Sequence, residues 1–160
     1  KIIFSPPSRG DQLNLGANNA QENWLFFMHA DTLLNNKNIK DIKKFIKNKN
    51  YKNVGYFKLR FDSTSISALI ISYWANIRTV LFKLPFGDQC LLIHKSYYQE
   101  IGGFSHIPIM EDLDFIIKVP KKNKTLFNST VLTSFRKYKK NGVFKQCYKN
   151  IINQIKFLNK

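Results

Sequence analysis

Short apolar runs alternate with segments of helical periodicity along most of the chain, and this alternation limits the possible folds more than any other feature. The clearest run, residues 23–29 (NWLFFMH), is uninterrupted, as is typical of a parallel strand covered on both faces. Further strands are expected at residues 1–4, 54–62, 89–95 and 125–133. Helices are expected at residues 8–20, 37–49, 65–82, 97–103 and 111–119. This order predicts an α/β fold with a sheet between layers of helices.

Two of the expected helices have recognisable local signals. Ser8 stands at the N-cap position of the helix at 8–20, and Asp11 three positions later makes an imperfect capping box. The helix at 37–49 is basic and periodic. Its apolar side chains share one face: Ile39, Ile42, Phe45 and Ile46.

The length of 160 residues and the hydrophobic content of 44% are enough for one sizeable core. The first residue is Lys1 rather than Met, so we expect the sequence to be part of a larger protein. The longest apolar stretch, residues 66–86, is interrupted by Asn76, Arg78 and Lys83, which would be costly in a membrane-spanning helix. No transmembrane segment is therefore predicted within these residues.

The two cysteines, Cys90 and Cys147, lie far apart in the sequence and form no CxxC pair. This spacing argues against a disulfide framework and against a structural metal site. A reducing compartment, and hence a cytoplasmic location, is the expectation.

Positive charge is concentrated at the end of the chain. Of the net charge of +16, residues 115–160 contribute +12, because they hold 12 Lys or Arg and no acid. Such a patch suits phosphate groups on nucleic acid, on anionic lipid or on a nucleotide-linked substrate. A bias of genomic base composition towards Lys and Asn would produce the same excess.

The last segment, residues 143–160, has apolar residues at helical spacing with lysines between them. It predicts an amphipathic basic helix that follows a domain over residues 1–142. This helix could pack on the domain or on an absent segment, or it could lie on a membrane surface such as the inner face of the cell membrane.

Two groups of acids stand where strands end or helices begin. Asp31 follows the apolar run at 23–29, and at such a strand end a hard oxygen ligand suits Mg²⁺ or Mn²⁺ shared with substrate phosphates. Asp31 could equally cap a turn with Thr32. Glu111 and Asp112 open a helix, where they could simply cap it or could provide a general base.

Four segments occur together in one order: residues 8–20 (SRGDQLNLGANNA), 24–32 (WLFFMHADT), 84–115 (LPFGDQ…GGF…MEDLDF) and 133–142 (TSFRKYKKNG). In this order and spacing they resemble family 2 glycosyltransferases. The resemblance is to a bacterial branch with H-A-D-T in place of D-x-D, and it covers nearly the whole chain.

The resemblance implies a GT-A (Rossmann-like) fold with a mixed, mostly parallel sheet flanked by helices, here lacking the first strands. It also implies a nucleotide-sugar donor, a divalent cation and inverting transfer to a hydroxyl of an unidentified glycan or lipid acceptor. Asp31 would contact the metal, Mg²⁺ or Mn²⁺, and the donor diphosphate. His29 stands where the first acid of the motif commonly lies.

Further roles follow from the same resemblance. Asp112 would be the catalytic base, and Glu111 would position the acceptor or the base. Arg136, with Tyr138 as its aromatic neighbour, would neutralise the leaving diphosphate. The donor pocket would be lined by Arg9, Asn14 and Gly16. The acceptor side would be bordered by Gly87, Asp88 and Gln89. If this is the whole polypeptide, about the first two strands of the family's sheet are absent, and weak or no activity is expected.

Two other classes of function remain as alternatives. A nucleic-acid-binding domain would use the basic tail and its aromatic residues, but it leaves the acids at the strand and helix ends unexplained, so no nucleic-acid partner is predicted. A non-catalytic, membrane-peripheral domain would tolerate the loss of Asp31 or Asp112.

Overall fold

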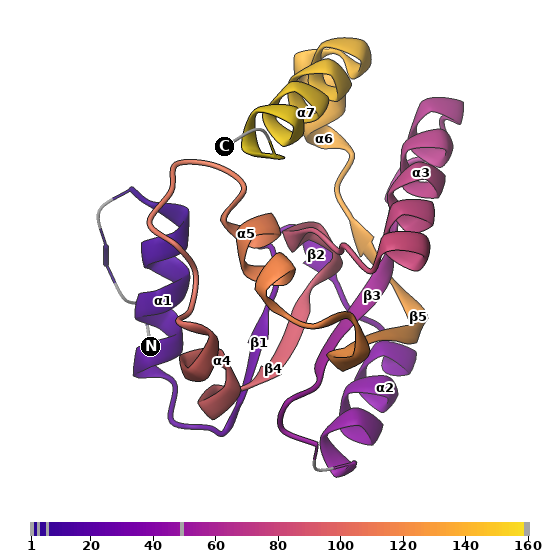
Figure 1. Cartoon of the computed structure of the whole chain (residues 1–160). Helices are drawn as coiled ribbons and strands as arrows, with labels where there is room; N and C mark the ends of the chain where they lie inside the picture. The colour runs from indigo at the N-terminus through magenta and orange to yellow at the C-terminus, as the bar shows by residue number, and fades with distance from the viewer. Residues whose placement is uncertain (1, 3, 6, 49, 159–160) are drawn as a thin grey trace.

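The computed structural model describes residues 2, 4–5, 7–48 and 50–158 (Figure 1). The helices are α1 (Arg9–Asn19), α2 (Asn36–Lys47), α3 (Ile66–Phe82), α4 (Lys95–Ile101), α5 (Glu111–Lys118), α6 (Arg136–Asn141) and α7 (Val143–Leu158). The strands are β1 (Trp24–Phe27), β2 (Thr32–Leu33), β3 (Val54–Phe61), β4 (Leu91–His94) and β5 (Lys124–Thr133). Short 3-10 turns occur at Gly87–Gln89 and Lys121–Asn123.

The five strands form one mixed sheet in the order β1-β4-β3-β5-β2. Among the described strands, only β3 and β5 pair in parallel, whereas β1 with β4, β4 with β3, and β5 with β2 are antiparallel. The prediction of a mostly parallel sheet is therefore wrong, although the α/β class and the flanking helices are confirmed.

The apolar run at 23–29 explains the error in strand direction. Its strand β1 is an edge strand antiparallel to β4, with Phe27 opposite Leu91. Alternate side chains of β1 enter the two cores on opposite faces of the sheet: Leu25 and Phe27 one of them, Trp24 and Phe26 the other. Coverage on both faces makes the run apolar, but coverage does not set the direction of the neighbouring strand.

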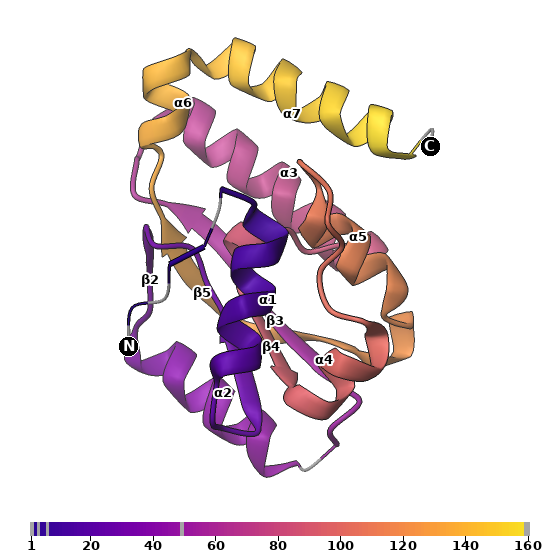
Figure 2. The ribbon, with the colours of Figure 1, turned by 90° about the vertical axis from the view of Figure 1, so that its left-hand side faces the viewer.

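The two cores lie on opposite faces of the sheet. One contains side chains of α1, α4 and α5, including Tyr98 and Phe115, and the other contains side chains of α2, α3 and α6, including Phe45. Figures 1 and 2 show α1, α4 and α5 on one side of the strands and α2 and α3 on the other. Helices α3 and α7 lie at the same end of the molecule in both views.

Strand β3 pairs with β4 at Val54 and Gly55. Further along this edge of β3, side chains bond the backbone N–H and carbonyl groups instead. Asn76 of α3 accepts from the Leu59 N–H and donates to the Leu59 carbonyl, both at 2.9 Å, and Gln89 donates to the Phe57 carbonyl at 3.0 Å. Asn76, which interrupts the apolar stretch, and Gln89, which follows it, thus satisfy buried backbone groups.

Local signals near the start of the chain give a mixed outcome. Ser8 caps α1 through its Oγ, 3.4 Å from the Asp11 nitrogen, as predicted. The strand expected at 1–4 falls partly outside the described residues, and the described Ile2 and Phe4 lie in no strand and are exposed. Within the described residues, no helix is both long and apolar enough to cross a membrane.

Candidate functional site

Strand direction brings the predicted site residues to one edge of the sheet. Because β4 is antiparallel to both β1 and β3, and β5 is parallel to β3, the carboxyl ends of β1, β3 and β5 share that edge. Asp31 follows β1, and Arg136 follows β5. The segment before β4 and the first turn of α5 meet them there.

A cavity of about 590 Å³ opens at this edge. Six of the predicted residues line it: Arg9, His29, Asp31, Gly87, Asp112 and Arg136. They come from α1, the β1–β2 turn, the turn before β4, α5 and α6. The fold thus brings together residues as far apart in the sequence as Arg9 and Arg136. Apolar side chains, among them Phe27, Phe86 and Phe104, form the rest of the lining.

Asp112 is held in a fixed orientation by two backbone N–H groups. The Gly87 nitrogen donates to its Oδ2 at 2.7 Å, and the Leu113 nitrogen donates to its Oδ1 at 2.8 Å. The residue lies in the first turn of α5, where the helix dipole favours a negative charge. Each carboxylate oxygen keeps acceptor capacity, so Asp112 can still take a proton from a group in the cavity.

Arg9 connects α1 with two other site residues. Its Nε lies 2.9 Å from the Oε1 of Glu111, which is buried, and its Nη2 bonds the Nε2 of His29. Burial raises the pKa of Glu111, and the Arg9 charge opposes this rise. Glu111 thus anchors the guanidinium and does not itself line the cavity.

The surroundings of His29 favour its neutral form. Burial, and after it the Arg9 guanidinium, lowers the pKa of His29 below its ordinary value of 6.5. A neutral imidazole can accept the hydrogen bond from Arg9, and His29 then helps to fix that guanidinium at the cavity.

Gly87 lies where three functional side chains converge. A Cβ at this position would lie 2.6 Å from Arg9 Nη2, 2.9 Å from His29 Nε2 and 3.1 Å from Asp112 Oδ2. Any side chain here would displace at least one of these groups. The absence of a side chain at Gly87 is therefore a condition for the present geometry of the site.

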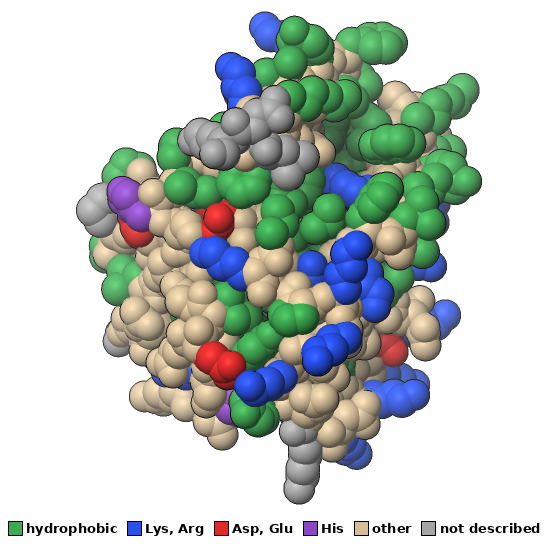
Figure 3. Space-filling view, viewed as in Figure 1, with side chains coloured by type: hydrophobic (Ala, Val, Ile, Leu, Met, Phe, Trp, Pro, Cys, Tyr) green, Lys and Arg blue, Asp and Glu red, His purple; other side chains and the backbone are tan. Residues whose placement is uncertain are grey.

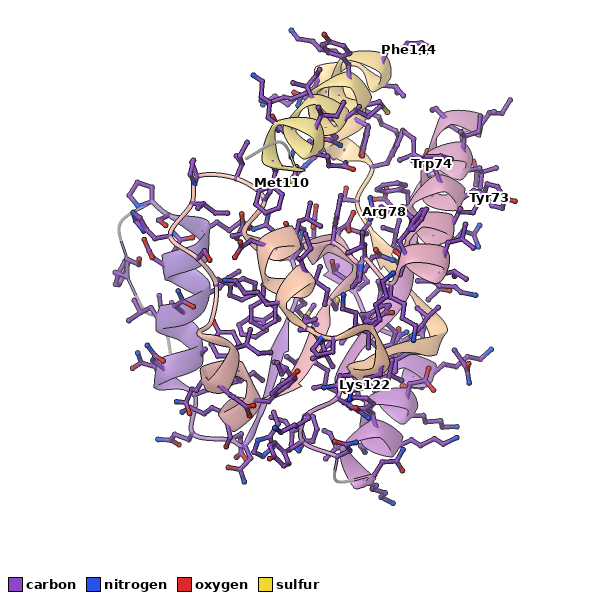
Figure 4. All side chains as sticks on the ribbon, viewed as in Figure 1. Tyr73, Trp74, Arg78, Met110, Lys122 and Phe144 are labelled. Atoms are coloured by element: carbon purple, nitrogen blue, oxygen red, sulfur yellow. The ribbon has the colours of Figure 1, made fainter. Side chains whose placement is uncertain are left out.

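Asp88 lies behind the cavity wall rather than in its lining. Its Oδ1 is enclosed and has no hydrogen-bond partner among the described residues. Burial raises the pKa of Asp88 to about 6, and the Arg78 charge acts in the opposite direction. Arg78 stacks on the Phe86 ring, 3.4 Å from its centroid, and donates to the Leu84 carbonyl at 3.1 Å. Figure 4 labels Arg78 on α3.

Asp31 lies at the tip of the β1–β2 turn, which the Thr32 N–H closes by donating to the His29 carbonyl at 3.1 Å. Among the described residues there is no group of three or more His, Cys, Asp or Glu that could hold a metal ion. The exposed Asp31 carboxylate fits one kind of metal site, in which Mg²⁺ or Mn²⁺ takes one carboxylate and completes its shell with substrate phosphates and water. The Nε2 of His29, predicted as a second ligand, faces the Arg9 guanidinium, so this nitrogen is not open to a metal ion.

Besides Glu111 and Asp88, three further predicted residues do not line this cavity. Asn14 bonds the Tyr98 hydroxyl and both the N–H and the carbonyl of Phe104, which is a packing role. Gly16 borders a second hollow, of about 630 Å³, between α1 and β1. Gln89 is fully buried.

Gln89 bonds the chain's own groups. Its Oε1 accepts from the Thr79 hydroxyl at 2.7 Å and from the Phe86 N–H at 3.2 Å. Tyr138, expected beside Arg136, stacks on Phe135, and burial raises its pKa to about 12.

Sequence reasoning missed two features of the site. Arg78 was noted as an interruption of an apolar stretch, and a lone charge in such a stretch is itself a signal of an internal partner. Cys90 lines the cavity with φ 57° and ψ 167°, a region that non-glycine residues rarely adopt, and no sequence signal announces it.

No protein-family model, curated protein or solved structure matches this chain. The chemistry of the cavity therefore has to be inferred from its own residues.

Proposed function

We propose that this chain is a glycosyltransferase domain of the GT-A type that transfers a sugar from a nucleotide-sugar donor to a hydroxyl acceptor with inversion. The observation that carries the proposal is the convergence of Arg9, Asp31, Asp112 and Arg136 on one cavity from four separate parts of the chain. Two guanidinium groups suit a diphosphate, and a fixed carboxylate suits a base.

In the proposed reaction Asp112 takes the proton of the acceptor hydroxyl, whose oxygen attacks the anomeric carbon in line. The bond between that carbon and the diphosphate oxygen breaks, and the diphosphate leaves with the electron pair. Arg9 and Arg136 line the cavity and would stabilise the charge that builds on the leaving group. The apolar lining limits water, which would otherwise compete with the acceptor.

A divalent cation, when bound, would be held by Asp31 and would neutralise part of the diphosphate charge. In this proposal His29 bonds Arg9 and holds its guanidinium in place, and it does not bind the cation. Its role therefore differs from that of the acid that commonly stands at this position of the motif. The proposal places the protein in the cytoplasm, in keeping with its two free cysteines.

The test measures donor binding and transfer separately. Thermal unfolding of the chain is followed with UDP-, GDP-, dTDP- and CMP-sugars, with and without Mn²⁺, because a ligand of the folded state raises Tm. One nucleotide class should raise Tm in a Mn²⁺-dependent way, and Asp31→Asn should lose the Mn²⁺ dependence. Glu22→Gln, an exposed acid outside this cavity, is the matched control.

Asp112→Asn separates binding from catalysis. It should keep the donor-induced rise in Tm and should lower donor turnover by about 10² to 10⁴, the usual contribution of a general base. Turnover unchanged in Asp112→Asn, or the absence of a Tm shift with every donor, would refute the proposal.

A further inference from the structure

The apolar stripe of α7 faces away from the domain. Phe144, Tyr148, Ile151 and Ile155 follow one another at helical spacing and are 92%, 69%, 53% and 48% exposed. Figure 3 shows hydrophobic side chains gathered over this end of the molecule. An ordinary surface helix buries such a stripe in the core, so α7 has the reverse orientation.

Polar side chains occupy much of the inner face of α7. Gln146 is buried, accepts from the Asn141 amide at 2.7 Å and donates to Asn150 at 2.7 Å. Asn150 in turn donates to the Tyr138 hydroxyl at 3.1 Å. These bonds fix the rotation of α7 about its own axis, and this rotation directs the apolar stripe outward.

Helix α3 also exposes an apolar side, although Ile71 and Ala75 of its inner side pack into the core. Its inner side carries Asn76, bonded to the backbone of β3, and Thr79, bonded to Gln89. Its exposed apolar residues are Ile66, Leu69, Ile70, Tyr73, Trp74, Val80, Leu81 and Phe82. Figure 4 shows Tyr73 on the outer side of α3 and Phe144 at α7.

Positive charge accompanies this apolar surface. The exposed lysines of α7 are Lys145, Lys149 and Lys156, and neither α3 nor α7 contains an acid. An anionic partner would complement this charge, whereas a second copy of a chain with net charge +16 would bring like charges together. Exposed apolar patches of this extent mark interaction sites.

We propose that the exposed apolar residues of α3 and α7, here called the docking face, bind the surface of an anionic lipid bilayer. The aliphatic and aromatic side chains would enter the boundary between head groups and acyl chains, and the lysines of α7 would meet lipid phosphates. Trp74, Tyr73 and Tyr148 are of the types that favour this boundary. The proposal concerns a surface outside the cavity and does not depend on the transferase reaction.

The first test is co-sedimentation of the chain with vesicles of phosphatidylcholine alone or with 30% phosphatidylglycerol. Binding should need the anionic lipid and should weaken with salt. The triple variant K145Q/K149Q/K156Q should bind about 10- to 100-fold more weakly. The matched control K40Q/K43Q/K44Q removes three exposed lysines of α2 and should bind like the parent.

A second test reports insertion of the docking face directly. The chain has two tryptophans, Trp24 and Trp74, and Trp74 is 68% exposed. In the variant Trp24→Phe, which keeps an aromatic ring against Phe45, the emission comes from Trp74 alone. It should shift to shorter wavelength with the anionic vesicles, and F144S/I151S should reduce binding more than the control L33S, an exposed leucine of β2.

Several results would overturn the proposal. The first is the absence of binding to anionic vesicles. The second is an equal loss of vesicle affinity in the α7 and α2 lysine variants. The third is an unchanged Trp74 emission wavelength although the chain sediments with the vesicles. A stable dimer that shields Trp74 without lipid would assign the docking face to self-association. Binding of DNA or RNA in preference to vesicles would assign the charge to nucleic acid.

Discussion

The buried carboxyl group of Asp88 should make the stability of the protein depend on pH in a defined direction. Burial raises its pKa to about 6 in the folded chain, against 3.8 as the ordinary value. Between these two values the folded chain holds a proton that the unfolded chain releases, so the free energy of unfolding falls as the pH rises. The cost of the buried charge is complete above pH 6 and disappears towards pH 4.

The size of the effect follows from these values. A pKa of about 6 in place of 3.8 corresponds to about 3 kcal/mol, and about 2 kcal/mol of this lies between pH 4 and pH 7. The variant Asp88→Asn carries no titrating group at this position. The free energy of unfolding of Asp88→Asn, relative to that of the parent, should therefore rise by about 2 kcal/mol as the pH increases from 4 to 7.

Urea unfolding of both proteins at intervals from pH 4 to pH 7.5 measures this difference, and the other titrating groups cancel in the comparison. Glu22→Gln, which removes an exposed acid elsewhere on the surface, serves as the control for the loss of one negative charge. If the free-energy difference between Asp88→Asn and the parent is constant across the range, Asp88 ionises normally and the enclosed carboxyl inferred here does not exist.

Three further predictions concern the same region. Asn76→Ala leaves the buried N–H and carbonyl of Leu59 without their partner and should cost about 2 to 4 kcal/mol in urea unfolding. Gln89→Leu removes the partner of the Phe57 carbonyl and of the Phe86 N–H, whereas the Thr79 hydroxyl still donates to the Ala75 carbonyl. A loss of about 2 to 4 kcal/mol measured by thermal unfolding would confirm a structural role. Gly87→Ala should change stability by under about 1 kcal/mol, because flexible side-chain ends can move, yet it should abolish donor-induced Tm shifts.

Helix positions were largely predictable because local signals set them. The Ser8 cap and the apolar face of α2 act over a few residues, and the structure agrees with both to within a few residues. Strand pairing depends on contacts distant in the sequence. Nothing in the run at 23–29 states that its neighbour would be β4 or that the two would be antiparallel.

The orientation of amphipathic segments was also beyond the sequence. The periodicity of α7 indicates an apolar face but not the direction in which that face points. That direction depends on the polar bonds of Gln146 and Asn150, which involve Asn141 and Tyr138. In α3, the interruptions at Asn76 and Arg78 were informative, because a polar residue in an apolar stretch often marks the side that meets buried polar groups.

The convergence of the candidate site was predictable although the sheet was not, and the reason lies in strand direction rather than strand neighbours. Asp31 and Arg136 follow β1 and β5, which point the same way even though β4 runs against β1 and β3 between them. Residues after co-directional strands reach the same edge whatever runs between those strands. The antiparallel β4 adds to the site, because the segment before it begins at that edge and brings Gly87 within 2.7 Å of Asp112. A mixed sheet can thus assemble the polar groups that a parallel sheet was expected to gather.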